Sequence, residues 1–250
     1  MNRLLMAGKK TALVSGGSNG IARAQAELFA SEGAKVVIGD IDDVAGEQVA
    51  ADIRKAGGSA LYVHLDVSSE RSWVSAVATA MDAFGGLTTL LNTAGIYRMA
   101  SIDDESPEGF LRMATVNQLG VLLGMKSALP ALRASGNGAI LNMASAAAVR
   151  VYPEQIAYSA SKAAVKLMSQ TAANENGRFG VRVNSIYPGP VKKTGMLKDA
   201  TREVLDAALS TMPLGRMATP EDIAYGSLYL CSDLAINVTG GLSLRSMADS

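Results

Sequence analysis

The 250-residue sequence contains only one histidine and one cysteine, and each scarcity excludes a class of site. The single histidine, His64, rules out zinc sites built on several histidines, and any Ser-His-Asp triad would have to use it. The single cysteine, Cys231, cannot form an internal disulfide, so the chain suits a reducing compartment. We predict no metal site.

The sequence also lacks an excess of either charge and any long apolar run. Lysine plus arginine and aspartate plus glutamate both number 23, which leaves a formal net charge of zero. This balance provides no basic footprint for nucleic acid and no basic face for an anionic membrane. No apolar run approaches the roughly 18 residues that span a bilayer, and Lys9 and Lys10 end the N-terminal run too early for a signal peptide. We expect a soluble, cytoplasmic protein.

Short apolar, β-branched runs alternate with longer helical patterns along the chain. The runs are almost continuously apolar, which is typical of strands buried on both faces. The predicted strands are 11–15, 35–39, 60–65, 89–92, 139–143, 181–186 and, more weakly, 242–245. The helical patterns lie near 20–31, 43–56, 69–84, 107–134, 154–178 and 220–232.

The repeated strand-then-helix order predicts an α/β fold. We expect a doubly wound, Rossmann-type parallel sheet of about seven strands with helices on both faces. No repeat or linker divides the sequence, so residues 1–250 are predicted to form a single domain. The region 188–219 is rich in proline and glycine, and a long irregular stretch of this kind is typical of a substrate loop or lid.

A glycine-rich segment, SGGSNGIA at 15–22, follows the first predicted strand and opens a helix. Such a turn presents free backbone N–H groups and the positive end of the helix dipole to a phosphate. Gly16 would form the tight turn, and Gly20 would let the backbone approach a pyrophosphate. The alternative is an ordinary glycine-rich turn between a strand and a helix.

The same letters also fit G-x-S-x-G, the nucleophile elbow of hydrolases, with Ser18 as the nucleophile. That motif normally stands well into the chain, with the histidine downstream. Here the serine follows the first strand, and His64, the only available base, lies inside a predicted strand. A hydrolase is therefore disfavoured.

Asp40 ends the second predicted strand, about 20 residues after Gly20. An acidic residue at this place accepts hydrogen bonds from the adenosine ribose hydroxyls and repels a 2′-phosphate. No basic residue stands at position 19 or 41 to neutralise that phosphate. The pattern favours NAD over NADP, and the alternative is a helix cap or a solvated aspartate.

With these motifs the chain resembles the short-chain dehydrogenase/reductase family over nearly all of its length. The resemblance rests further on Asp66 in LDV (65–67), NTAG (92–95), Asn117 in VNQLG (116–120), Ser145 in LNMAS (141–145), YSASK (158–162), YPGPV (187–191) and the tail 213–240. It implies a nicotinamide cofactor held by Gly16, Ser18, Asn19, Gly20, Ile21, Asp40, Asp66, Val67, Asn92, Ala94, Gly95, Tyr158, Lys162, Pro188, Gly189 and Val191.

The sequence departs from the family pattern at several positions. The replacements are Ser15, Ala22 and Thr93 for the commoner threonine, glycine and asparagine, and Ser-Met-Ala at 246–248 for an acidic-Gly-Gly. Lys192 and Lys193 displace the threonine that usually follows the PG, and Thr194 is the candidate for its role.

Tyr158 and Lys162 lie four residues apart in a predicted helix, so they share one face. A free tyrosine has a pKa of about 10, and a nearby ammonium group favours the phenolate and lowers that pKa. We predict that Tyr158 is a general acid/base whose pKa Lys162 lowers. The resemblance implies that Lys162 also bonds the nicotinamide ribose. The alternative is a half-buried tyrosine beside a solvated lysine.

Two further residues complete the predicted catalytic set. Ser145 leaves a strand at the carboxyl edge of the sheet, where its hydroxyl would bond the substrate oxygen. The resemblance implies that Asn117 holds a water linking Lys162 to solvent. Alternatively, Ser145 caps the following loop and Asn117 satisfies helix backbone.

The predicted function is NAD(H)-dependent interconversion of a hydrophobic secondary alcohol and its ketone. The alternative is a non-catalytic NAD-binding protein on the same fold. The substrate would contact Ala147, Tyr152, Gln155, Met196 and Leu197, with 97–99 as a further wall. The family is commonly tetrameric, so the resemblance implies a homotetramer formed through the two long helices near 107–134 and 154–178.

Overall fold

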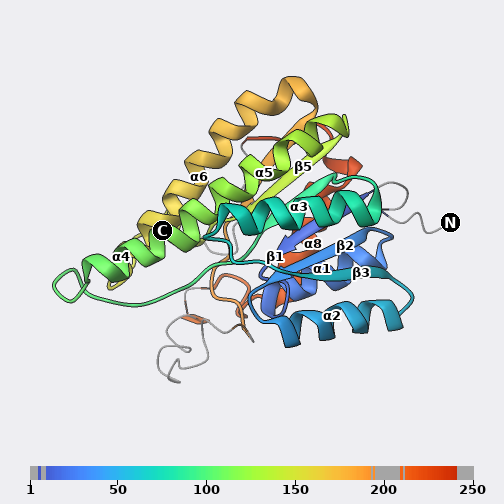
Figure 1. Ribbon diagram of the computed structural model, residues 1–250. Coiled ribbons are helices and arrows are strands. Elements are labelled where there is room, and N and C mark those ends of the chain that lie inside the picture. Colours follow the sequence, from blue (N-terminus) through green and yellow to red (C-terminus); the bar gives the residue numbers. More distant parts are fainter. Residues whose placement is uncertain (1–4, 7–9, 193, 195–208, 211, 241–250) are drawn as a thin grey trace.

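The computed structural model describes residues 5–6, 10–192, 194, 209–210 and 212–240 (Figure 1). Within them, six parallel strands form one sheet in the order β3-β2-β1-β4-β5-β6. The strands are β1 (Thr11–Ser15), β2 (Lys35–Asp40), β3 (Ser59–His64), β4 (Thr89–Asn92), β5 (Gly138–Met143) and β6 (Val181–Ile186). The six stronger strand predictions are confirmed to within one residue, and the weaker run, 242–245, lies outside the described residues.

Helices cover both faces of the sheet, as the alternating pattern predicted (Figure 1). On one face lie α1 (Gly20–Ser31), α2 (Asp43–Lys55) and α8 (Pro220–Cys231). On the other lie α3 (Glu70–Phe84), α5 (Gly120–Ala134) and α6 (Ile156–Asn176). The shorter elements are α4 (Pro107–Ala114), the π-helix η1 (Thr115–Leu119) and the 3₁₀-helices η2 (Ala146–Ala148), η3 (Gly177–Phe179) and η5 (Asp233–Ala235).

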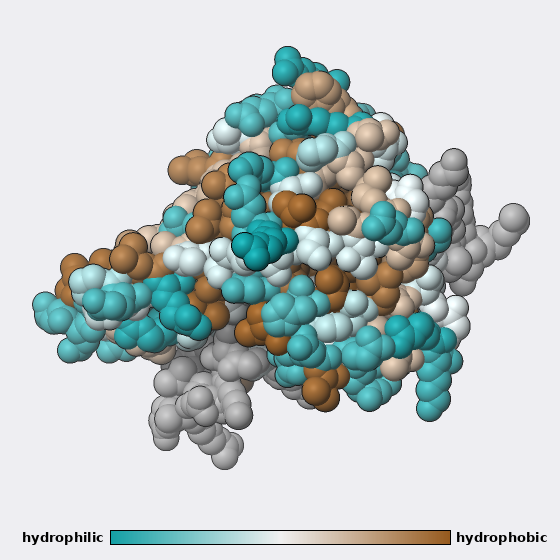
Figure 2. Space-filling view, in the orientation of Figure 1, coloured by the Kyte–Doolittle hydropathy of each residue, from teal (hydrophilic) through white to brown (hydrophobic). Residues whose placement is uncertain are grey.

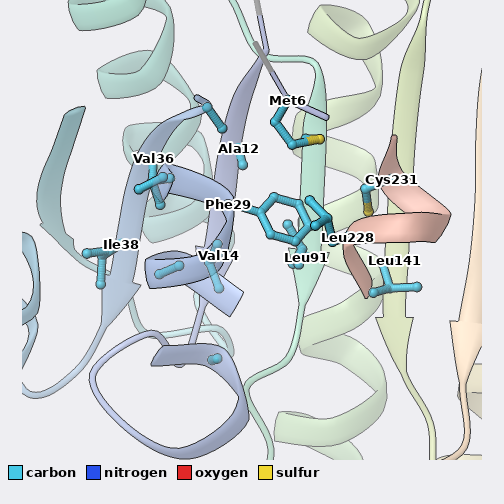
Figure 3. Close-up of a cluster of buried hydrophobic side chains, with 14 of the residues drawn as sticks. Met6, Ala12, Val14, Phe29, Val36, Ile38, Leu91, Leu141, Leu228 and Cys231 are labelled. Atoms are coloured by element: carbon cyan, nitrogen blue, oxygen red, sulfur yellow. The ribbon is translucent and has the colours of Figure 1, made fainter. Parts of the chain in front are cut away.

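Each central strand contributes side chains to two hydrophobic cores, because successive side chains point to opposite faces of the sheet. On β1, Ala12 and Val14 enter the core beneath α1 and α8, whereas Leu13 enters the core beneath α3 and α5. Figure 3 shows the first core, in which Phe29 of α1 lies beside Leu228 of α8. Phe29 is fully buried, and burial of such a ring contributes about 2–3 kcal/mol.

The helix expected over 107–134 is interrupted. Ser106 caps α4 by accepting a hydrogen bond from the Gly109 amide at 3.0 Å. The chain then widens into the π-helix before α5 begins. Single π-helical turns of this kind are frequent at functional sites, and this one carries Asn117.

The described residues include no helix that is both long and apolar enough to cross a membrane.

Candidate active site

The strand order brings four loops together at the carboxyl edge of the sheet. The chain runs outward from β1 to β3 and then returns to place β4 beside β1. This reversal is the topological switch point, outside which ligands of open α/β sheets bind. The loops after β1, β4, β5 and β6 therefore form the candidate site.

The glycine loop packs too closely against its neighbours to carry side chains. Gly16 has a φ of +76°, and a Cβ there would lie 2.9 Å from Cα of Ala94. At Gly17 a Cβ would lie 2.8 Å from Cγ2 of Ile38. The Gly16 amide also donates to the Gly39 carbonyl at 2.8 Å. The first two glycines are therefore required by the packing of β1 against β2 and the loop after β4.

The N-terminus of α1 fits a phosphate group. Asn19 stands at the N-cap position in an extended conformation, but its side chain makes no capping hydrogen bond, and the first turn contains no acidic residue. The first N–H groups of a helix have no partner within the helix. Here the positive end of the α1 dipole and these donors suit the pyrophosphate of a dinucleotide, with Gly20 and Ile21 in the first turn.

Asp40 lies beside the glycine loop, as the spacing predicted. One carboxylate oxygen accepts from the Ser18 amide at 3.0 Å, and the other accepts from the Asp42 amide at 3.1 Å. The Asp40 carbonyl accepts from the Tyr62 hydroxyl at 2.7 Å. Each carboxylate oxygen keeps lone-pair capacity for a further donor. This geometry fits a ribose with two free hydroxyls.

Asp66 and Val67 follow β3 at the same edge. The Asp66 carboxylate accepts from the Ser68 amide at 2.9 Å and the Ser68 hydroxyl at 2.7 Å, and these bonds lower its pKa. Asp66 is exposed. The Val67 carbonyl accepts from the indole of Trp73 at 3.0 Å.

In the segment 92–95, which was predicted to bind the cofactor, the Asn92 side chain points away from the edge of the sheet. The Asn92 side chain lies in the interior, where it donates to Oδ1 of Asn142 at 2.8 Å. A Cβ on Gly124 of α5 would lie 2.4 Å from its Oδ1. The structure therefore does not bring the Asn92 side chain to the cofactor edge. Ala94 is at the edge, against Gly16.

Two polar residues that the sequence did not single out as functional hold this segment. Ser15 Oγ accepts from the amides of Thr93 at 3.1 Å and Ala94 at 3.2 Å. The Thr93 hydroxyl donates to Gln25 at 2.7 Å, and Gln25 donates to Ser227 of α8 at 2.7 Å. The departures Ser15 and Thr93 are thus accommodated by specific hydrogen bonds.

Tyr158 enters the site from the first turn of α6. It is buried and shares a side-chain hydrogen bond with Ser145. Burial raises the pKa of Tyr158 to about 12, and the Ser145 bond opposes that rise. Ser145 also caps η2 by accepting from the Ala147 amide at 3.1 Å. Ser145 therefore caps the following loop, as the alternative interpretation held, and its hydroxyl also lies beside Tyr158.

Lys162 lies one turn beyond Tyr158, with 2% of its surface exposed. Its Nζ is 5.7 Å from the centroid of the Tyr158 ring and donates to the Met143 carbonyl at 2.8 Å. Burial lowers the pKa of Lys162 to about 8. The sequence predicted that this ammonium lowers the pKa of Tyr158. Among the protein groups, desolvation instead prevails and the tyrosine pKa rises.

Asn117 joins the loop after β4 to α6. Its Nδ2 donates to the Ile96 carbonyl at 2.9 Å and to Ser161 Oγ at 3.1 Å, while its Oδ1 accepts from the Ile96 amide at 2.9 Å. A Cβ on Gly95 would lie 3.1 Å from Asn117 Oδ1 and 3.4 Å from Lys162 Nζ. The buried side chains of Asn117 and Lys162 therefore both lie against Gly95.

The predicted substrate residues fall into three groups. Ala147 and Tyr152 belong to a small apolar cluster around Tyr158, separate from the two main cores. Gln155 pairs with Ala100 in an isolated β-bridge. The remaining two predictions, Met196 and Leu197, lie outside the described residues.

The loop after β6 lies against the loop after β5 and beside the glycine loop. The Pro188 carbonyl accepts from the Ala146 amide at 2.9 Å, and Gly189 follows it. Val191 is buried, and its carbonyl accepts from the Thr194 hydroxyl at 3.0 Å. A Cβ on Gly20 would lie 3.7 Å from Cγ2 of Thr194. Thr194, the candidate for the displaced threonine, is therefore beside the glycine loop.

Among the described residues, no group of three or more histidine, cysteine, aspartate or glutamate side chains is placed to hold a metal ion.

Known proteins are similar to this chain over most of its length. A family model described as enoyl-(acyl carrier protein) reductase, of the short-chain dehydrogenase/reductase family, matches residues 16–243. The 2,5-dichloro-2,5-cyclohexadiene-1,4-diol dehydrogenase LinX of Sphingobium indicum is 47% identical, with 92% of each chain covered. The 3-alpha-(or 20-beta)-hydroxysteroid dehydrogenase of Mycobacterium tuberculosis is 39% identical, covering 92% of this chain and 85% of that protein. The crystal structure of gox2181 superposes with a TM-score of 0.93 at 26% identity, covering 98% and 97% of the two chains. The chain belongs to the short-chain dehydrogenase/reductase family.

Proposed function

We propose that this oxidoreductase uses NAD(H) to interconvert a secondary alcohol on a carbocyclic ring and the corresponding ketone. The observation that carries the proposal is the grouping of the buried Tyr158 and Lys162 with the partly buried Ser145 at the carboxyl edge of the sheet, near its switch point. Alcohol oxidation needs a proton acceptor at the substrate oxygen, and ketone reduction needs a proton donor there.

Tyr158 is the proposed general acid/base. Its raised pKa means that it carries its proton near neutral pH, which suits proton donation to a ketone oxygen. A bound nicotinamide accepts or supplies the hydride, and its oxidised ring adds a positive charge. In the oxidation direction that charge, together with the Lys162 ammonium, would favour the phenolate. The Ser145 hydroxyl, bonded to Tyr158, would hold the same substrate oxygen.

Lys162 has three N–H donors, of which one is committed to the Met143 carbonyl. The others are proposed to reach the nicotinamide ribose. The side-chain amide of Asn117 is occupied by Ile96, Met113 and Ser161. A water that relays protons from Lys162 would therefore be held by the Asn117 backbone, within the π-helix.

The choice of NAD rests on Asp40. Its carboxylate is oriented by the amides of Ser18 and Asp42 beside the glycine loop, where a negative charge would repel a 2′-phosphate. Asp66, Val67, Ala94, Gly95 and the loop after β6 would complete the cofactor site. We further propose that residues 188–219 form the substrate loop of a single domain.

The carbocyclic substrate class rests on the walls of the site and on the relatives. The partly buried members of the cluster around Tyr158 are Ile96, Tyr97 and Tyr152, so a substrate there would meet mainly apolar surface. The names of both relatives designate alcohols of ring compounds. An apolar ring bearing a hydroxyl group fits these walls.

A homotetramer is proposed from the apolar surface of the long helices. Leu111, Leu119, Leu122 and Leu167 are all at least 40% exposed and lie on α4, η1, α5 and α6. Figure 2 shows apolar side chains in brown along the edge where these helices lie in Figure 1. Apolar patches of this kind mark interaction sites.

The proposed location is the cytoplasm. The single cysteine, Cys231, is a buried free thiol, which suits a reducing compartment.

The test is an absorbance assay with cyclic alcohols and ketones, run in both directions with NAD(H) and NADP(H) in parallel. We expect turnover with NAD(H) at least tenfold more efficient than with NADP(H). A preference for NADP(H) would contradict the proposed role of Asp40. Tight NADH binding without turnover of any substrate would favour the non-catalytic alternative.

A further inference from the structure

Within the segment between β4 and α4, residues 96–100 are held by hydrogen bonds at both ends. At one end, Asn117 bonds both the amide and the carbonyl of Ile96, each at 2.9 Å. At the other, the Ala100 amide donates to the Glu154 carbonyl at 2.8 Å, and Ala100 forms a parallel bridge with Gln155. The four residues after Ile96 thus form a short strap between the π-helix and the start of α6.

The residue that accepts the second fastening has an unusual backbone. Glu154 is the only non-glycine residue with a positive φ, 59°, among the residues that the structure describes. This left-handed conformation costs about 1 kcal/mol or more and persists only where surrounding contacts impose it. Here it directs the Glu154 carbonyl to the Ala100 amide just before α6 begins. The hydrogen bond that holds the strap to the start of α6 therefore requires a strained backbone conformation at Glu154.

Tyr97 lies on this strap and faces Tyr158. The two rings are 4.9 Å apart between centroids and 88° apart in plane, which is a favourable edge-to-face arrangement. Tyr97 is only partly buried and belongs to the same apolar cluster as Tyr158, with Ile96 and Tyr152. Its ring is thus fixed in position and still has surface that another molecule could contact.

We propose that Tyr97 is a specificity-determining residue, whose fixed ring forms the wall on which a carbocyclic alcohol packs while its oxygen meets Ser145 and Tyr158. This inference rests on the proposed function and deepens it. A rigid ring substrate loses little conformational freedom on packing against a rigid wall, whereas an open-chain alcohol must also freeze its rotatable bonds. The Tyr97 wall should therefore favour cyclic over open-chain substrates of equal size.

The test compares Tyr97→Leu with Tyr97→Phe, which keeps the ring and removes only the hydroxyl. The substrates are cyclohexanol and hexan-2-ol, which have the same number of carbons. Tyr97→Leu should lower kcat/KM for cyclohexanol about tenfold, the scale of one lost aromatic contact, and change hexan-2-ol less than twofold. Tyr97→Phe should behave like the wild type with both. An equal loss for both alcohols, or no loss, would overturn the proposal.

A binding measurement separates this inference from the proposed function. With NAD present, cyclohexanone and hexan-2-one cannot be reduced, and their dissociation constants can be measured by calorimetry. Tyr97→Leu should weaken cyclohexanone binding about tenfold and leave hexan-2-one unchanged. That result without any turnover would support the role of Tyr97 and refute the catalytic proposal. If Tyr97→Leu bound each of the two ketones as tightly as the wild type does, the proposed role of Tyr97 would be refuted.

Discussion

The two ends of the candidate site are built from different parts of the chain. The glycine-loop end, comprising 16–20 and Asp40, consists mainly of backbone groups of one continuous strand–turn–helix unit and the next strand. The tyrosine end consists of side chains from the loop after β5 and from α6: Ser145 is partly buried, and Tyr158 and Lys162 are buried. The glycine-loop end depends on close backbone packing that leaves no room for side chains at Gly16 and Gly17. The tyrosine end depends on the protonation of its side chains.

The largest expected effect is at the tyrosine end. Tyr158→Phe removes the proposed proton donor but keeps the ring that packs against Tyr97. We expect kcat to fall at least about 1,000-fold, within the range of general acid–base catalysis, while NADH affinity changes less than threefold. Stopped-flow turnover and fluorescence titration of NADH measure the two quantities. Normal turnover in Tyr158→Phe would remove Tyr158 from the mechanism.

The corresponding change at the glycine-loop end is Gly16→Ala. The new Cβ would lie 2.9 Å from Cα of Ala94, at a φ of +76°, so the loop or its neighbour must move. We expect a cost of roughly 3 kcal/mol, typical of overpacking, and thus NADH binding weakened about 100-fold. Turnover at saturating cofactor should change much less.

Gly57→Ala is the matched control, because Gly57 also has a positive φ, +90°, but meets nothing within 4 Å. Both variants carry left-handed strain, whereas only the first has the close contact. Equal NADH affinity in the two variants would show that the approach of Gly16 to Ala94 is unimportant.

The two ends also differ in how far the sequence predicted them. The glycine loop and Asp40 could be placed because their positions follow from local spacing along one β-α-β unit. The direction of the Asn92 side chain was not predicted, although strand alternation could have given it. Leu90 packs beneath α5, so Asn92, two residues on, must point to the same face. The motif match alone therefore did not show that the side chain of this predicted cofactor residue is buried.

At the tyrosine end, the residues were predictable but their electrostatics were not. The i, i+4 spacing correctly placed Tyr158 and Lys162 on one face of α6. Their pKa values depend on burial, which tertiary packing determines, and packing buries both groups. The π-helix around Asn117 was likewise not predicted, because the partners of the Asn117 side chain, Ile96 and Ser161, lie far away in the sequence.

The buried ammonium at the tyrosine end makes stability depend on pH. The pKa of Lys162 is about 8 in the folded chain and 10.5 in its ordinary state. Between these values the unfolded chain binds more protons, so the free energy of unfolding rises with pH across this window. From pH 7.5 to 9.5, wild type should gain about 2 kcal/mol relative to Lys162→Met.

Urea unfolding at the two pH values measures this difference. Lys166→Met, one turn further along α6 and partly exposed, controls for the loss of a positive charge from the helix. An identical pH dependence in wild type and Lys162→Met would contradict the depressed pKa of Lys162.

The smallest expected effect is at Tyr62, a residue that supports the glycine-loop end. The Tyr62 hydroxyl donates to the Asp40 carbonyl at 2.7 Å and to Asp43 at 2.5 Å, and a Cβ on Gly46 would overlap its ring. Tyr62 thus supports the position of Asp40 from the neighbouring strand. Tyr62→Phe should weaken NADH binding about fivefold, the value of one hydrogen bond of about 1 kcal/mol, with kcat unchanged. Tyr225→Phe, at an exposed tyrosine of α8, should have no effect. A fall in kcat without a change in NADH affinity would mean that Tyr62 acts on the tyrosine end, and the two ends would not be separable as described.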